Sequence, residues 1–129
     1  MLVGKPGLDG HSNGAEQIAV RARDIGLEVV YDGIRSTPDQ LVVAAIEEGV
    51  HIIGLSILSG SHIHLVRTIM ELLKKSGYKK IPVIVGGIIP PIDEKRLIKI
   101  GVKAVFTPKD FKIEDIMEKI VEVIKVSYE

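Results

Sequence analysis

The 129-residue chain contains no cysteine, which excludes disulfide bridges, thiolate metal sites and cysteine nucleophiles. Aromatic residues make up only 4% of it, so the core must be aliphatic. Lysine plus arginine and aspartate plus glutamate balance at 17 each, which argues against a general attraction to nucleic acid or anionic membranes. No apolar run approaches the roughly 18 residues of a membrane-spanning helix. We therefore expect a soluble cytoplasmic protein without a signal peptide.

What the chain does contain is an alternation of short apolar runs with amphipathic segments. Its length fits a single domain over residues 1–129. The apolar runs are short and rich in β-branched residues, which is typical of buried strands. They cover residues 2–3, 28–31, 51–57, 82–85 and 102–106. The segments with helical spacing of apolar residues cover 15–25, 39–48, 62–75, 94–100 and 114–126.

Five β-α units in strict alternation predict an α/β fold, with a parallel sheet covered by helices on both faces. Right-handed crossovers lead to a flavodoxin-like doubly wound sheet, for which this size class favours the strand order 2-1-3-4-5. Ligands of such sheets bind beyond the carboxyl ends of the strands, where the strand order reverses. A site is therefore expected in the loops over residues 5–14, 56–61, 86–91 and 107–110.

The loop expected over residues 5–14 combines reactive side chains with glycine and proline. It holds Lys5, Asp9 and His11 among three glycines. A neutral imidazole binds transition metals, and its second nitrogen is usually held by a carboxylate or a carbonyl. Asp9 could be that carboxylate, and Lys5 could hold Asp9 in turn. Because Asp-x-His is a short pattern with many chance matches, a solvated glycine turn is the alternative on spacing alone.

Small residues dominate the loops expected after the third and fourth strands. Ser56, Gly60 and the pair Gly86-Gly87 stand there, and such residues let the backbone approach a bulky ligand. A serine at a strand end is also a common capping residue, and a glycine pair also makes a tight turn. A binding site is favoured because all these residues fall on the same edge of the predicted sheet as the first loop.

Three motifs on this edge together resemble the signature of a known family. Asp9-x-His11-x-x-Gly14, Ser56-x-Leu58 and Gly86-Gly87 are similar, in order and spacing, to the cobalamin-binding (B12-binding) domain of methylmalonyl-CoA mutases, glutamate mutase and related corrinoid proteins. The resemblance covers essentially the whole chain. The stretches Lys5-Pro-Gly-Leu and Gly86-Gly-Ile-Ile-Pro-Pro91 look specifically like the methylmalonyl-CoA mutase branch, as its small subunit or C-terminal domain.

The resemblance implies adenosylcobalamin as cofactor and gives each motif a role. His11 would coordinate the cobalt from the lower face, in place of the cofactor's own dimethylbenzimidazole. Asp9 would accept the other imidazole N–H, and Lys5 would support Asp9. The displaced nucleotide tail would lie between the sheet and the first helix. The further cofactor-binding positions are Gly10, Gly14, Ser56, Leu58, Gly60, Gly86 and Gly87.

By the same resemblance the chain is a subunit of an isomerase that is inactive alone. A chain of 129 residues cannot also supply an eight-stranded catalytic barrel. A separate large subunit would bind the acyl-CoA, and the reaction would interconvert (R)-methylmalonyl-CoA and succinyl-CoA. A mutase-associated GTPase chaperone is a second implied partner. Neither nucleic acid nor a membrane is expected to bind.

Two other functions compete with this one. A corrinoid carrier or sensor would use the same ligand motif, and the mutase-like stretches argue against it. A phospho-acceptor receiver domain shares the fold, and Lys109 imitates its lysine, but Ser56 stands where the acceptor aspartate is needed.

Two further segments leave their roles open. Residues Thr107–Asp110 lack the glycines that mutases often carry there, so their contact with the nucleotide tail is undecided. His62 and His64 form an H-x-H pair, for which we favour packing at a helix start or contact with the cofactor ring edge over a second metal site.

Overall fold

The computed structural model describes residues 1–6, 13–57, 63–87, 89–107 and 112–128. For residues 5–6, 13–16 and 31–36 it describes the backbone alone. No helix among these described residues is both long and apolar enough to cross a membrane.

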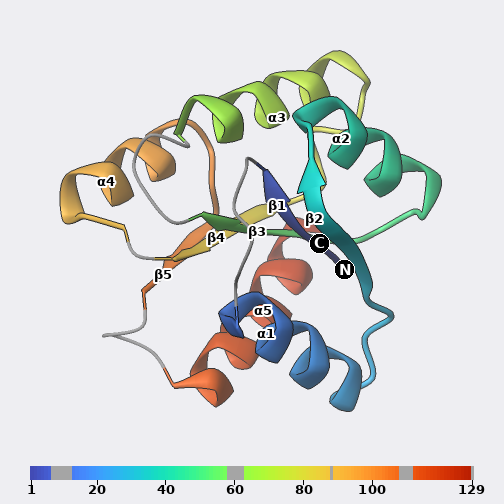
Figure 1. The fold of residues 1–129 in the computed structure, drawn as a ribbon, viewed down its shortest axis with the longest axis vertical. Coiled ribbons are helices and arrows are strands. Elements are labelled where there is room, and N and C mark those ends of the chain that lie inside the picture. The colour runs from blue at the N-terminus through green and yellow to red at the C-terminus, as the bar shows by residue number, and fades with distance from the viewer. Residues whose placement is uncertain (7–12, 58–62, 88, 108–111, 129) are drawn as a thin grey trace.

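The strands form one parallel sheet in the order β2-β1-β3-β4-β5 (Figure 1). Every pair of neighbours is parallel. The predicted α/β class with a parallel, flavodoxin-like sheet is confirmed, and the observed order is the one expected from the sequence. The strands are β1 Leu2–Pro6, β2 Val30–Ser36, β3 Ile53–Ile57, β4 Val83–Gly87 and β5 Ala104–Phe106.

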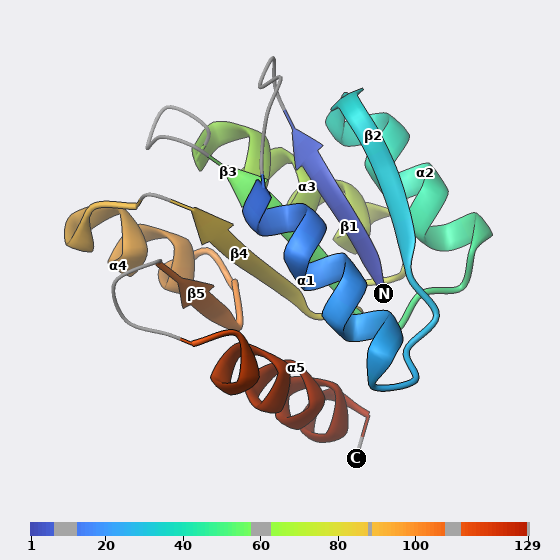
Figure 2. The same cartoon turned by 60° about the horizontal axis from the view of Figure 1, so that its bottom comes forward.

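Helices cover both faces of the sheet. One face carries α1 and α5, and the other carries α2, α3 and α4 (Figures 1 and 2). Each helix connects two consecutive strands, apart from α5 at the end, as the alternation predicts. The helices are α1 Asn13–Asp24, α2 Pro38–Glu47, α3 Ile63–Lys75, α4 Pro91–Lys99 and α5 Ile113–Ser127.

Two hydrophobic cores result, because successive side chains of a strand point to opposite faces. In β3, Ile53, Leu55 and Ile57 belong to the core under α2, α3 and α4. The core under α1 and α5 takes its members from alternate positions of the strands, such as Ile84 and Phe106. Nearly all buried side chains are aliphatic, as the composition predicts.

The helix ends follow local sequence signals. Thr37 caps α2: its hydroxyl accepts a hydrogen bond from the Gln40 backbone N–H at 3.2 Å, while the Gln40 side chain accepts one from the Thr37 N–H at 3.0 Å. This reciprocal pair satisfies two N–H groups that a helix start leaves without partners. Glycines follow several helices with positive φ, for example 61° at Gly49 and 112° at Gly101, a conformation that favours glycine.

Three element boundaries differ from the prediction by three residues or more. β1 extends to Pro6 and β2 to Ser36, beyond the apolar runs that marked them. β2 pairs only with β1, and an edge strand accepts the polar residues that a buried strand would reject. Helix α4 begins at Pro91, three residues before its apolar pattern, because proline suits the first position of a helix.

Candidate functional site

The carboxyl ends of β3, β4 and β5 bring together the small residues that the sequence predicted to form a site. Ser56 is in register with Gly86, and Ile57 with Gly87. Gly86 is also in register with Phe106 of β5. Ser56, Gly86 and Gly87 therefore lie inside the strands rather than in the loops that follow them, which corrects the predicted boundaries.

Ser56 and Gly86 face α1 and α5. Their strand neighbours Leu55 and Val85 lie in the core under α2, α3 and α4, so strand alternation turns positions 56 and 86 to the opposite face. Helix α1 packs over β1 and β3 on that face, and Figure 2 shows its first turn near the carboxyl ends of the strands. Both residues are partly accessible to solvent. A ligand between the sheet and α1 would thus reach them.

Gly86 and Gly87 are glycine for different structural reasons. Gly87 has φ of 151°, and a Cβ there would collide with the carbonyl oxygen of Ile57, so the fold itself requires glycine. Among the described residues, a Cβ at Gly86 would meet only the carbonyl oxygen of Phe106, at an ordinary 3.8 Å. Within the described part of the chain, there is therefore room beside Gly86 for a ligand.

For the other predicted site residues, the structure describes either the backbone alone or no part of the residue. Lys5 lies within β1 rather than in the loop after it, and Gly14 lies in the first turn of α1; the side chain of Lys5 is not described. The remaining predicted positions lie outside the described residues, so their roles stay predictions. These are Asp9, Gly10, His11, Leu58 and Gly60.

The described residues contain no cluster of three or more histidines, cysteines or carboxylates that could hold a metal ion. His64 is exposed on α3, where its carbonyl accepts a hydrogen bond from the Thr68 hydroxyl at 2.9 Å. His62 and residues 108–110 lie outside the described part. Thr107, which follows β5, is partly buried.

Two long-range contacts that the sequence did not reveal hold the helices of this face. The guanidinium of Arg21 in α1 lies 3.8 Å from the Glu114 carboxylate in α5. At the opposite end of the sheet, the Tyr128 hydroxyl donates a hydrogen bond of 3.0 Å to the His51 carbonyl, and the two rings meet edge to face at 5.5 Å. Partial burial raises the pKa of Tyr128. These pairs are 93 and 77 residues apart in the chain, so no local pattern could have indicated them.

The decisive comparison is with protein families. A family model described as "B12 binding domain" matches residues 1–122. The chain belongs to this family. The predicted membership is therefore confirmed, and the cofactor of this B12-binding domain is cobalamin.

Curated relatives of this B12-binding domain are coenzyme A mutases. An ethylmalonyl-CoA mutase of Methylorubrum extorquens is 56% identical over 97% of the chain, and a methylmalonyl-CoA mutase of Escherichia coli is 40% identical over 84%. The chain spans only 18% and 15% of these two proteins. A 2-hydroxyisobutanoyl-CoA mutase small subunit of Aquincola tertiaricarbonis is 38% identical, with 90% of the chain matching 88% of that subunit.

Solved structures show the same fold. A cobalamin-binding protein from Desulfitobacterium hafniense superposes with a TM-score of 0.74 at 20% identity, over 95% of this chain and 58% of that one. A Francisella response-regulator receiver domain gives 0.68 at 14% identity, over 98% of both chains. At such low identity these likenesses show the fold alone. The family match is what separates this chain from receiver domains.

Proposed function

We propose that this chain binds adenosylcobalamin and presents it to the catalytic barrel of an acyl-CoA mutase. One observation carries the proposal. In a chain that matches the B12-binding family over residues 1–122, Ser56 and Gly86 stand side by side on the α1 face of the sheet, with space above Gly86. Residues 1–129 would then form one cobalamin-binding domain.

The described residues fit the nucleotide tail of this cofactor. A planar heterocycle needs a slot whose walls carry small side chains, and Gly86 would provide such a wall, since no described side chain fills the space beside it. The Ser56 hydroxyl, on the same face, would donate a hydrogen bond to the benzimidazole. Gly87 supports this arrangement from within the strand, since its backbone conformation keeps β4 close to Ile57.

The first loop would hold the metal end of the cofactor. We propose His11 as the lower axial ligand of cobalt, with Asp9 accepting its second ring N–H and Lys5 supporting Asp9. A carboxylate partner fixes the imidazole tautomer and raises its basicity. Gly10 and Gly14, with Leu58 and Gly60 from the loop after β3, would border the tail. When bound, adenosylcobalamin supplies a cobalt–carbon bond whose homolysis starts radical rearrangement of the substrate.

The chain would act as a subunit or domain that is inactive without a catalytic partner. It spans 18% of an ethylmalonyl-CoA mutase but 88% of a separate small subunit, so both arrangements exist among its relatives. We propose the separate-subunit arrangement, with the acyl-CoA pocket in the large subunit. A mutase-associated GTPase chaperone is a further proposed partner.

The substrate is proposed as an alkylmalonyl-CoA. The sequence resemblance led to (R)-methylmalonyl-CoA, which would be interconverted with succinyl-CoA. The comparisons add a second candidate, because two ethylmalonyl-CoA mutases are 56% and 55% identical to the chain, whereas two methylmalonyl-CoA mutases are 40% and 43% identical. We therefore place ethylmalonyl-CoA ahead of methylmalonyl-CoA.

Electron paramagnetic resonance of the Co(II) form tests the ligand assignment. In chain labelled with ¹⁵N-histidine, we expect coupling of the cobalt electron to a histidine nitrogen. His11→Ala should abolish this coupling, while His64→Ala, which alters an exposed histidine of α3, should leave it intact. Coupling that persists in His11→Ala would refute the assignment.

Reconstitution with a large mutase subunit then tests the function. We expect turnover of ethylmalonyl-CoA or methylmalonyl-CoA only when both chains are present. Turnover by this chain alone would contradict the subunit role. Cobalamin binding with His11 coordination, but with methyl transfer in place of isomerisation, would indicate a corrinoid carrier.

A further inference from the structure

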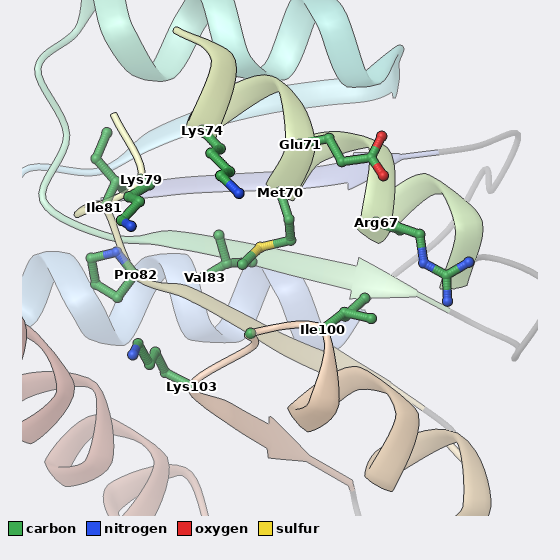
Figure 3. Close-up of a pocket in the computed structure, with 11 residues that line it drawn as sticks. Arg67, Met70, Glu71, Lys74, Lys79, Ile81, Pro82, Val83, Ile100 and Lys103 are labelled. Carbon is green, nitrogen blue, oxygen red and sulfur yellow. The ribbon is translucent and has the colours of Figure 1, made fainter. Parts of the chain in front are cut away.

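A hollow of about 470 Å³ lies at the opposite end of the sheet from Ser56 and Gly86. It opens between α3 and the end of α4, above the first residues of β4 (Figure 3). Its lining comes from three segments: the outer face of α3, the turn before β4 and the turn before β5. We call it the amino-edge groove, and its lining residues are Arg67, Met70, Glu71, Lys74, Lys79, Ile81, Pro82, Val83, Ile100, Gly101 and Lys103.

The amino-edge groove exists because α4 is shorter than α3. Helix α4 ends at Lys99, while the longer α3 continues to Lys75. Helix α2 packs against α3, and on the side of the groove Ile100 and Gly101 border the last turns of α3. Gly101 has φ of 112°, and a Cβ there would touch the Met70 methyl group, so the chain turns tightly under Met70.

The floor of the groove is apolar. Ile81, Pro82 and Val83 are buried at its base, and Met70 and Ile100 are half-buried at its sides. In Figure 3, Met70 and Ile100 approach the groove from opposite walls. An occupant with apolar side chains would remove this surface from water, which is the main favourable contribution to protein association.

The rim of the groove is cationic. Arg67, Lys74, Lys79 and Lys103 surround it, against the single carboxylate of Glu71. All four cations are exposed, and none of them has an ion-pair partner within the described part of the chain. The chain as a whole carries no net charge, so the positive charge at the groove is a local excess.

We propose that the amino-edge groove docks an acidic amphipathic helix of a partner polypeptide. The hollow is open and shallow, whereas small-molecule sites enclose most of their ligand. Its apolar floor is recessed, whereas membrane-binding surfaces project apolar side chains outward. Arg67 and Lys74 are two turns apart on α3, about 10 Å, which matches carboxylates at i and i+7 of a docked helix, while its apolar anchors meet the floor. Carboxylates beside those anchors would meet the rim.

The test uses the full chain and a synthetic helical peptide of alanine, leucine and glutamate, with the leucines on one face. We expect saturable binding, with amide shifts confined to α3, residues 79–83 and residues 100–103. Lys74→Glu/Lys103→Glu should weaken binding about tenfold or more, because the double reversal removes two attractions at the rim and replaces them with repulsion. The matched reversal Lys95→Glu/Lys125→Glu, at exposed positions outside the groove, should change it less than twofold.

A variant of the floor separates docking from simple charge attraction. Met70→Gln keeps the length of the side chain and should weaken binding of the peptide severalfold. Inorganic triphosphate serves as a probe of the rim charge alone, and its binding should be the same in Met70→Gln as in wild type. The proposal is wrong if the peptide does not bind, if both double reversals act alike, or if Met70→Gln has no effect. It is also wrong if anionic phosphatidylserine vesicles or a second copy of this chain occupy the groove with the same dependence on Lys74 and Lys103. Circular dichroism of each variant establishes that it is folded.

Discussion

At the scale of single residues, the Gly86-Gly87 pair shows how two identical neighbours can serve different purposes. Glycine is required at position 87 because a side chain there would collide with the carbonyl of Ile57 on the adjacent strand, whereas no described side chain fills the space beside Gly86. The sequence predicted both as cofactor contacts. It could not separate them, because the difference depends on the backbone of a strand 30 residues away in register.

This difference leads to a paired prediction. Gly87→Ala should destabilise the fold by about 1–3 kcal/mol or more, because it forces a side chain into strained backbone and against a carbonyl. Gly86→Ala should change the unfolding free energy by less than about 1 kcal/mol, yet weaken cobalamin binding because the methyl group enters the tail's slot. Urea unfolding and a spectroscopic cobalamin titration measure the two effects. Equal loss of stability in both variants, or unchanged cobalamin affinity in Gly86→Ala, would contradict the distinction.

At the scale of elements, much of the fold was predictable because the apolar periodicity changes between strands and helices. The prediction was weakest at β2 and at the start of α4. Strand β2 continues through Asp32, and helix α4 begins at Pro91. Neither residue is part of an apolar pattern, so the periodicity could not include it. The amino-edge groove was out of reach as well, since its walls come from three separate segments.

The end of α5 gives a prediction at this scale. Tyr128 ties the last helix to the turn before β3 through the His51 carbonyl. Tyr128→Phe keeps the ring contact but loses the hydrogen bond, which should cost about 0.5–1.5 kcal/mol, toward the low end because the residue is 42% exposed. Chemical denaturation of both proteins at neutral pH measures this cost, and Tyr78→Phe, at a tyrosine exposed to a similar extent (43%), is the control.

Tyr128 also makes the stability of the fold depend on pH in the alkaline range. Desolvation by partial burial raises the pKa of Tyr128 above its ordinary value of 10.0, so the folded state favours the protonated phenol. This contribution is complete below pH 10 and is lost as pH rises through the higher folded pKa. The stability difference between wild type and Tyr128→Phe should therefore shrink above pH 10. A difference that stays constant or grows from pH 8 to 11 would contradict the coupling.

At the scale of the whole molecule, the described part of the candidate site lies at one edge of the sheet, apart from the two hydrophobic cores. The cores draw on all five strands and on helices of both faces, and the described cobalamin contacts Ser56, Gly86 and Gly87 belong to neither. The order of the motifs along the chain predicted this edge, because parallel strands bring their carboxyl ends together. Stability and cofactor binding should therefore be separable in this protein.

That separation gives the last prediction. The cobalamin-free chain should unfold in one cooperative transition, because its cores do not depend on the ligand. Cobalamin at about 100 times its dissociation constant should stabilise the fold by roughly 2.7 kcal/mol, which for a domain of this size raises the melting temperature by on the order of 10 °C. His11→Ala should melt at the same temperature as wild type without cofactor, but show a smaller rise at the same cobalamin concentration because its affinity is lower. Differential scanning calorimetry of both proteins, with and without cobalamin, measures these melting temperatures.

Two outcomes would contradict this prediction. Failure of the cobalamin-free chain to unfold cooperatively would show that the scaffold needs its cofactor. An equal rise of the melting temperature in wild type and His11→Ala would remove His11 from the site.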